Sequence, residues 1–321
     1  MNSIKSFTLN LEDLKFVHQG LARPESILAE KDGTLWTDDS RGSLTRINAD
    51  GKMTTVGTIG GEPNGFALAA DGHFYIPNIG DGNVYKMDKD GNHEIFLSEI
   101  DGKPLGAPNY VFIDSKDRLW ISISSRELPW FKTINTPTPD GYIILVDDNG
   151  PRIIADGIYF PNEIRMNEDE TFLYVAETMK ARMIRYPVNQ DGSLGEMEVF
   201  GPENLGEGGY IDGFTFDADG NVWVTTIIRN GIGLITPDGD YHVVFEDVNQ
   251  VALDAAIKAM ENGVMSPELM FACVGSTVQF PVSITFGGED LKTVYLGSLA
   301  MPHMVTFQSP IAGLKMRHWD D

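Results

Sequence analysis

A six-fold internal repeat constrains the fold of this chain more than any other feature. Each copy is a turn, in most copies rich in Asp and Gly, followed by a short apolar strand that ends in an aromatic residue. The six strand-ending aromatics are Trp36, Tyr75, Trp120, Tyr174, Trp223 and Tyr295. Because Asp-Gly supplies the positive-φ turn that joins two alternating strands, each copy predicts a β-hairpin.

The spacing of the copies predicts the architecture. Units of roughly 40–50 residues with four short strands each are typical of propeller blades. We therefore predict an all-β fold, a six-bladed β-propeller with four-stranded blades, in a single domain over residues 1–321. An irregular β-sandwich with coincidental Asp-Gly turns is the alternative. The approximate blades are 22–58, 62–98, 106–155, 160–200, 208–246 and 280–318.

Two segments interrupt the repeat. The first, 124–139, is Pro-rich and carries Trp130, and it is either a lid over one end of the propeller or a packed surface loop. The second has apolar residues at helical spacing and predicts one inserted helix near 248–262. Asp247 is a candidate cap for its start and Gly263 for its end. We expect this helix to pack on the exterior or the end of the propeller.

Equivalent positions in the six copies are polar. Counting back eleven or twelve residues from each aromatic reaches Glu25, Asn64, Asn109, Asn162, Asp212 and Ser283, here called the polar ring. The innermost strand of every blade lines the central channel, so these side chains should meet at one mouth of it. Any one Asn after Pro is an ordinary turn residue, but six polar residues in register predict a site.

The composition of the polar ring predicts its ligand. Two carboxylates and three amides, without His or Cys, suit a hard divalent cation bound through oxygen. We expect one such cation, with Ca²⁺ first and Zn²⁺, Mn²⁺, Mg²⁺ or Fe²⁺ as alternatives. Cys273 is the only cysteine, which excludes an intramolecular disulfide and a thiolate zinc cluster.

The charge of the chain bears on its partners. The sequence has 24 Lys and Arg against 47 Asp and Glu, a net charge of -23. Phosphate backbones and anionic lipid surfaces would repel such a chain, so we expect no nucleic-acid and no membrane partner. No signal segment is recognised, which favours a cytoplasmic location, with a periplasmic or secreted protein trimmed of its signal as the alternative. The oligomeric state stays open.

Several motifs together resemble a known family. Those that carry the polar ring are Arg23-Pro24-Glu25, Phe160-Pro161-Asn162-Glu163-Ile164 and Ile211-Asp212-Gly213-Phe214. From about residue 22 to 314 the chain resembles the calcium-dependent six-bladed propeller hydrolases of the senescence-marker-protein, gluconolactonase and luciferin-regenerating-enzyme group. The resemblance implies a divalent ion on Glu25, Asn162 and Asp212, with Asn109 contacting the metal or the substrate. It also implies that Asp212 is the base or nucleophile.

The chain departs from that group at two positions. Sugar-lactonase relatives have an Arg where this chain has Ala107, which predicts a substrate less polar than a sugar lactone. Thr215 stands where some relatives hold a second, structural calcium with Asp, so no second site is expected. The candidate substrate-binding residues are Asn64, Asn109, Tyr110, Trp130, Tyr159 and His303, with Glu177 as a possible support of the ring.

These observations predict a metal-dependent hydrolase that opens a lactone, with a small-molecule ester or lactone as its partner. An aryl esterase or a phosphotriesterase on the same site is an alternative within enzymes. A propeller that binds a ligand without catalysis is the alternative outside them. Gly-x-Ser-x-Gly, His-Glu-x-x-His and Walker motifs are absent from the sequence, which excludes the enzyme classes that those motifs mark.

Overall fold

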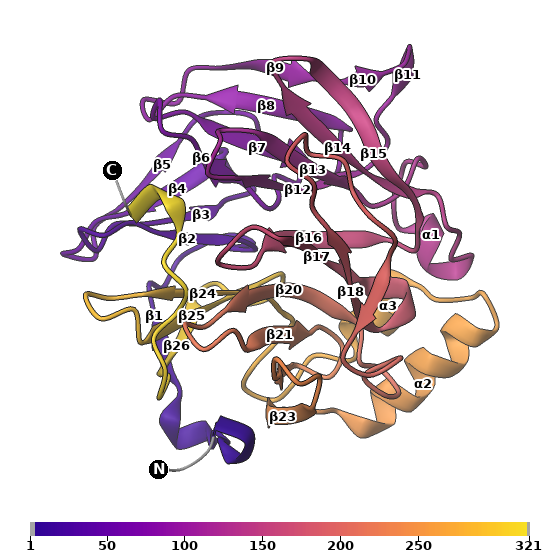
Figure 1. The fold of residues 1–321 in the computed structure, drawn as a ribbon. Coiled ribbons are helices and arrows are strands. Elements are labelled where there is room, and N and C mark those ends of the chain that lie inside the picture. Colours follow the sequence, from indigo (N-terminus) through magenta and orange to yellow (C-terminus); the bar gives the residue numbers. More distant parts are fainter. Residues whose placement is uncertain (1–3, 320–321) are drawn as a thin grey trace.

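The computed structural model, which describes residues 4–319, contains six four-stranded antiparallel sheets arranged as the blades of a propeller (Figure 1). The predicted six-bladed β-propeller is therefore confirmed. Neighbouring blades contact one another through their innermost strands. These strands are β2 (Ile27–Ala29), β6 (Ala67–Leu68), β12 (Pro108–Ile113), β16 (Pro161–Met166), β20 (Ile211–Phe216) and β24 (Pro281–Gly287).

The other strands follow in order from the channel outward. The second strands are β3 (Leu35–Asp38), β7 (Phe74–Asn78), β13 (Leu119–Ile123), β17 (Phe172–Glu177), β21 (Val222–Thr226) and β25 (Thr293–Ser298). The third are β4 (Leu44–Ile47), β8 (Asn83–Met87), β14 (Gly141–Asp147), β18 (Arg182–Pro187), β22 (Gly231–Ile235) and β26 (Met304–Gln308). The outermost are β5 (Met53–Val56), β9 (His93–Leu97), β15 (Gly150–Ile158), β19 (Glu198–Phe200), β23 (Tyr241–Glu246) and β1 (Lys15–Val17). A separate two-stranded hairpin, β10 (Glu99–Ile100) with β11 (Lys103–Pro104), follows the second blade in the chain.

The sixth blade is completed from the other end of the chain. Strand β1 pairs with β26, with Phe16 opposite Val305. The range 280–318 thus supplies three strands of this blade, and the fourth lies upstream of the range expected for the first blade. Because β1 joins the start of the chain to the last blade, backbone hydrogen bonds close the propeller into a circle.

The turns of the repeat share one backbone conformation. Gly33, Gly72 and Gly220 have positive φ, as the Asp-Gly signal predicts. In the three copies without this glycine, Asp117, Glu170 and Leu291 occupy the left-handed region instead. A side chain is disfavoured there, so the surrounding hairpins must hold these residues in place.

The strand-ending tryptophans anchor the blades. Trp36, Trp120 and Trp223 are fully buried. The indole Nε1 of Trp120 donates to Asp114 at 2.9 Å and that of Trp223 donates to Asp217 at the same distance. Each acid lies six residues before its tryptophan. The repeated phrase therefore encodes a buried aromatic together with the acceptor that its polar edge needs.

The α-helices gather at one end of the propeller, whereas the C-terminal segment lies at the other end (Figure 1). The α-helices are α1 (Lys132–Asn135), α2 (Gln250–Glu261) and α3 (Pro267–Phe271). The 3-10 helices are η1 (Ile4–Ser6), η2 (Leu11–Asp13), η3 (Thr178–Lys180) and η4 (Arg317–Trp319). Every helix among residues 4–319 is too short or too polar to cross a membrane.

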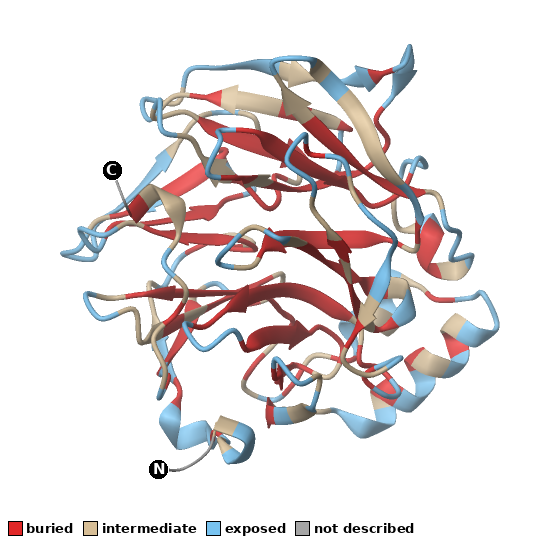
Figure 2. Ribbon diagram, viewed as in Figure 1, coloured by how far each residue is buried: buried red, intermediate tan, exposed pale blue. Residues whose placement is uncertain are grey.

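The inserted helix predicted near 248–262 is confirmed as α2. Its cap is Asn249, whose side chain accepts a hydrogen bond from the Ala252 amide, and not Asp247. Asp247 instead accepts from the amides of Thr277 and Val278 at 2.6 and 2.9 Å. Asp247 therefore pins the two ends of the insertion together. One face of α2 is buried and the other is exposed (Figure 2).

Candidate metal and active site

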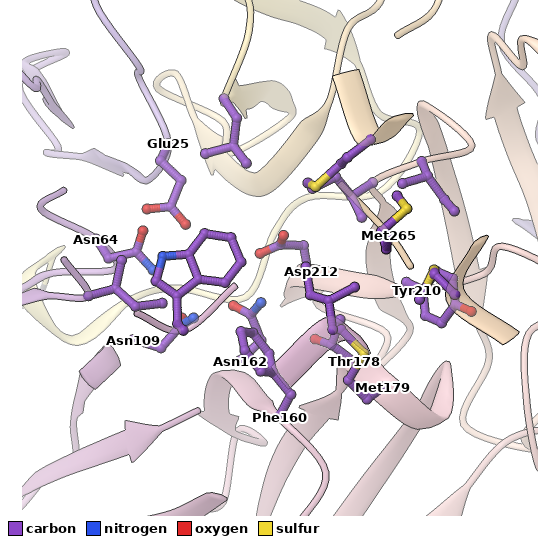
Figure 3. Close-up of a pocket in the computed structure, with 18 of the residues that line it drawn as sticks. Glu25, Asn64, Asn109, Phe160, Asn162, Thr178, Met179, Tyr210, Asp212 and Met265 are labelled. Atoms are coloured by element: carbon purple, nitrogen blue, oxygen red, sulfur yellow. The ribbon is translucent and has the colours of Figure 1, made fainter. Parts of the chain in front are cut away.

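A pocket opens at the mouth where the α-helices lie. Five of the six polar-ring residues line it: Glu25, Asn64, Asn109, Asn162 and Asp212. Figure 3 shows the carboxylates of Glu25 and Asp212 and the amide of Asn162 directed toward the same space. Ser283 is the exception, because its hydroxyl donates to the backbone oxygen of Glu25 beneath the pocket. We call Glu25, Asn109, Asn162 and Asp212 the floor of the pocket.

β-Bulges aim the floor residues into the channel. The register of β12 with β13 shifts at Asn109, that of β16 with β17 shifts across Asn162, and that of β20 with β21 shifts across Asp212. A bulge leaves its extra residue out of the ladder and turns its side chain to a new direction. The proline that precedes Asn109 and Asn162 is the trace of these bulges in the sequence.

Hydroxyl groups of one blade hold the backbone of the next blade at this mouth. Ser122 donates to the backbone oxygen of Asn162 at 2.6 Å. Thr178 donates to that of Ile211, the neighbour of Asp212, also at 2.6 Å. Ser283 completes the pattern between the sixth and first blades. These buried bonds fix the floor residues relative to one another across blade boundaries.

Gly213, directly after Asp212, is required by close packing. A Cβ at this position would lie 2.4 Å from the backbone oxygen of Val282 and 2.7 Å from a carboxylate oxygen of Glu163. No side chain fits between the fifth and sixth blades here. The contact between blades therefore requires the glycine of the Asp212-Gly213 pair, and the aspartate beside it is a candidate metal ligand.

The floor fits a hard cation. Glu25 Oε2, Asn109 Oδ1 and Asn162 Oδ1 are buried oxygens without a hydrogen-bond partner. A buried oxygen without a donor is costly, and a divalent cation among them would satisfy all three at once. Among the described residues 4–319, His, Cys, Asp and Glu alone form no group of three that could hold a metal. The amide oxygens must therefore contribute, as they do in oxygen-only sites.

The charges at the site favour a cation as well. Burial raises the pKa of Glu25 well above its usual range, and the neighbouring Asp38, Asp212 and Glu163 raise it further. Burial, with Glu163 beside it, raises the pKa of Asp212 to about 8, although a hydrogen bond with the Asn162 side chain lowers it. A divalent cation would lower both values and keep the two carboxylates ionised at neutral pH.

Arg23 is a pocket residue that the sequence analysis missed. Its guanidinium donates to the backbone oxygen of Pro63 at 2.7 Å and to Asn64 Oδ1 at 3.1 Å. One of its nitrogens also lies 3.7 Å from Glu25 Oε2. The Asn64 oxygen is therefore occupied by Arg23 and is not free for a metal. The sequence signal for this role was the position of Arg23 in the Arg-Pro-Glu motif, two residues before Glu25.

Of the predicted substrate-binding aromatics, only Trp130 lines the pocket. Its indole Nε1 donates to Glu62 at 3.0 Å, which fixes the orientation of the ring. Tyr110 does not line this pocket, because its ring packs against Gly65 and faces the guanidinium of Arg165. The Tyr159 ring lies outside the lining under Lys180, and the adjacent Phe160 lines the pocket instead.

His303 and Glu177 also lie elsewhere. The His303 ring packs edge-on against Phe16 of β1, outside the pocket lining, and its role in substrate binding stays a prediction. Glu177 accepts from the Tyr159 amide and from Arg182 at 2.6 Å. Both carboxylate oxygens of Glu177 are thus engaged outside the pocket lining, and its support of the ring stays a prediction.

The two interrupting segments cover the pocket, and we call residues 124–139 and 247–279 the roof. Trp130 and Ile134 from the first segment line the pocket, together with Met260, Met265 and Met270 from the second. The first segment is therefore a wall of the pocket and not a remote surface loop. The sequence analysis missed the methionines, although Met260, Met265 and Met270 recur every five residues.

A family model described as the SMP-30/gluconolactonase/LRE-like region matches residues 24–249. The chain belongs to this family. It is 24% identical to 6-deoxy-6-sulfogluconolactonase of Pseudomonas putida over 82% of this chain and 78% of that protein. It is 25% identical to the strictosidine synthase-like 4 protein of Arabidopsis thaliana, over 68% of this chain and 60% of that protein. A crystal structure described as a calcium-binding protein, regucalcin, from Agrobacterium tumefaciens has a TM-score of 0.67 at 16% identity, covering 94% of this chain and 95% of that one.

Proposed function

We propose that this protein is a metal-dependent lactonase, with one divalent cation, Ca²⁺ first, held by Glu25, Asn109, Asn162 and Asp212. The observation that carries the proposal is the set of buried, unpartnered oxygens on Glu25, Asn109 and Asn162 at the pocket floor. The family and the sulfogluconolactonase relative support the reaction class. The regucalcin described as calcium-binding supports the choice of ion.

In this proposal the bound cation supplies polarisation of the ester carbonyl and stabilisation of the negative charge that develops on its oxygen. Asp212 either takes the proton of the attacking water or attacks the carbonyl carbon itself. Asn109 and Asn162 orient their amide oxygens inward from the bulges. Arg23 offsets part of the negative charge beside Glu25 and holds Asn64 against the floor.

In this proposal the roof and Phe160 limit the access of bulk water to the floor. Trp130 and Phe160 pack with their ring centroids 6.1 Å apart above the floor residues. Low access of bulk water strengthens the electrostatic interactions at the carbonyl. Because Ca²⁺ is a weak Lewis acid, much of the rate must come from positioning by the rigid floor.

The test is an activity screen over lactones, aryl esters and phosphotriesters, with the protein either loaded with Ca²⁺ or stripped by a chelator. We expect turnover of lactones that is lost on chelation and restored by Ca²⁺. If aryl esters or phosphotriesters are turned over preferentially, they replace the lactone as the proposed substrate, and the proposed metal site is retained. Binding without turnover of any substrate would favour a non-catalytic propeller, and turnover in the stripped protein would overturn the metal.

A further inference from the structure

The pocket is chemically divided. Figure 3 shows the oxygens of Glu25 and Asp212 on one side, whereas Tyr210, Met179 and Met265 lie on the other. The second side, here called the arm, is lined by side chains of the roof, of η3, of the residue before β20 and of the loop between β21 and β22. Its residues are Met179, Tyr210, Ile227, Ile228, Met260, Met265 and Met270.

The roof is fixed firmly enough to define the shape of the arm. The Asn135 side chain donates to the backbone oxygen of Met265 at 2.9 Å and accepts from its amide at 2.5 Å. Ile134 joins Met265 and Phe280 in one buried apolar cluster with Leu253 of α2. The two segments, about 130 residues apart in the sequence, thus form one packed body above the floor.

The arm offers few partners to a polar substrate. Thr178, at its edge, already donates its hydroxyl to the Ile211 backbone oxygen. Hydroxyls of a sugar ring would lie among the side chains of Ile227, Ile228 and the methionines, where each unpaired hydroxyl is penalised. Methionine side chains are flexible and polarisable, so they adapt to an apolar chain whose conformation varies.

The packed interior beside the pocket has no room for a cationic side chain at position 107. Ala107 is completely buried and packs with Ile79 and Phe160, two residues that line the pocket. An arginine at 107, the residue of sugar-lactonase relatives, would have to displace one of these two. The sequence-based prediction of a less polar substrate thus acquires a structural reason, and methionines of the roof line the apolar side of the pocket in place of Tyr110 and Tyr159.

Together these contacts lead to one inference, which rests on the proposed function. We infer that the substrate is a lactone with a flexible apolar tail. Its ester group lies at the floor, and its tail occupies the arm between Met260, Met265 and Met270.

The test uses unsubstituted γ-butyrolactone and a series of γ-lactones whose alkyl tail grows from methyl to heptyl, on the Ca²⁺-loaded protein. We expect kcat/KM to rise by about fourfold for each methylene until the tail fills the arm, the factor expected for burying one methylene. An aldonolactone of the same ring size should be the poorer substrate. A flat or falling series, with the unsubstituted lactone turned over, overturns the inference and leaves the proposed reaction intact.

Variants assign the effect to the arm. We expect Met265→Gln and Met270→Gln to lower kcat/KM for the heptyl lactone by about tenfold, because a polar amide then replaces a thioether against the apolar tail. Turnover of unsubstituted butyrolactone should fall less, because this lactone has no tail to occupy the arm. Met197→Gln is the matched control, since Met197 is 45% exposed and lies outside the pocket. Equal losses for both lactones would assign a general structural role to these methionines and overturn the inference.

A binding experiment separates this inference from the proposed reaction. Calorimetry with linear alkyl carboxylates of increasing length needs no hydrolysis. We expect Kd to fall with chain length in the wild type and to lose this dependence in Met265→Gln. Binding that depends on tail length, without hydrolysis of any lactone, overturns the proposed reaction but supports the arm as the binding site of the tail. A Kd that does not depend on tail length overturns the arm itself.

Discussion

The floor of the pocket is made from the starts of the inner strands, whereas its roof is made from the two segments that interrupt the repeat. Each floor residue has a counterpart at the same position of another blade, and bulges turn Asn109, Asn162 and Asp212 inward in the same way. The roof has no such counterpart, because 124–139 and 247–279 occur once each. The repeat thus supplies the candidate metal ligands, and the insertions supply the side chains that we propose to contact the tail of the substrate.

The largest effect is expected at the floor. Asp212→Asn keeps an oxygen ligand of nearly the same shape but removes the base or nucleophile, so we expect kcat to fall by about a hundredfold or more while the metal stays bound. Steady-state kinetics and metal analysis of the same sample measure both. Asp90→Asn, in an exposed turn, is the control. A wild-type kcat in Asp212→Asn would show that another residue acts as the base or nucleophile.

The next prediction concerns the packing that aims Asp212. In Gly213→Ala the new Cβ meets the Val282 backbone oxygen and Glu163, so we expect a loss of about 1–3 kcal/mol in the free energy of unfolding. Cation affinity should fall with it, because Asp212 must shift. Urea unfolding and a Ca²⁺ titration test this. Unchanged stability together with unchanged Ca²⁺ affinity would contradict this prediction, because the blades could then move apart at Gly213 without displacing Asp212.

The stability of the stripped protein should depend on pH through the floor. Burial holds the pKa of Asp212 at about 8, above the ordinary 3.8, and raises that of Glu163 to about 7. Because the folded chain then binds protons that the unfolded chain releases, unfolding becomes easier as the pH rises from about 4 to about 8. The slope is about 1.4 kcal/mol per pH unit for one group.

Bound Ca²⁺ favours the ionised carboxylates and removes this slope. The difference in Tm between loaded and stripped protein should therefore widen from pH 5 to pH 8. Groups outside the site titrate equally in both forms and cancel in the difference. A Tm difference that narrows with rising pH would contradict the acidic, cation-binding character of the floor.

The smallest effect is expected at the roof. Asn135→Ala removes both hydrogen bonds to the Met265 backbone, so we expect a loss of about 1 kcal/mol in stability and a higher KM for lactones with long tails. The kcat for a short lactone should be unchanged. Asn149→Ala, in an exposed turn, is the control. A fall in kcat for the short lactone would show that the roof also shapes the floor.

The same division explains what the sequence could predict. Six aromatic strand ends in register, and a polar residue at a fixed distance before each, were enough for the propeller and the floor. In the sequence, the bulges that aim Asn109 and Asn162 are marked only by the proline directly before each asparagine. The closing role of β1 was missed, because three residues with no turn phrase of their own carry no repeat signal.

The rest of the site depends on tertiary contacts that no local pattern encodes. Tyr110 and Tyr159 are close in sequence to floor residues, yet Gly65 with Arg165, and Lys180, draw their rings elsewhere. The methionines of the arm reach the pocket only because α2 and α3 fold back over the mouth. A helical period shows which face of a helix is apolar, but not which surface that face covers.

The central claim is that turnover depends on one cation held by the floor. Its most direct measurement is calorimetric titration of the stripped protein with Ca²⁺, with lactonase activity recorded at each point. The account predicts one ion per chain, activity that rises in step with occupancy, and loss of both in Glu25→Gln combined with Asp212→Asn. Full activity in metal-free protein, or Ca²⁺ binding that survives in the double variant, would contradict it.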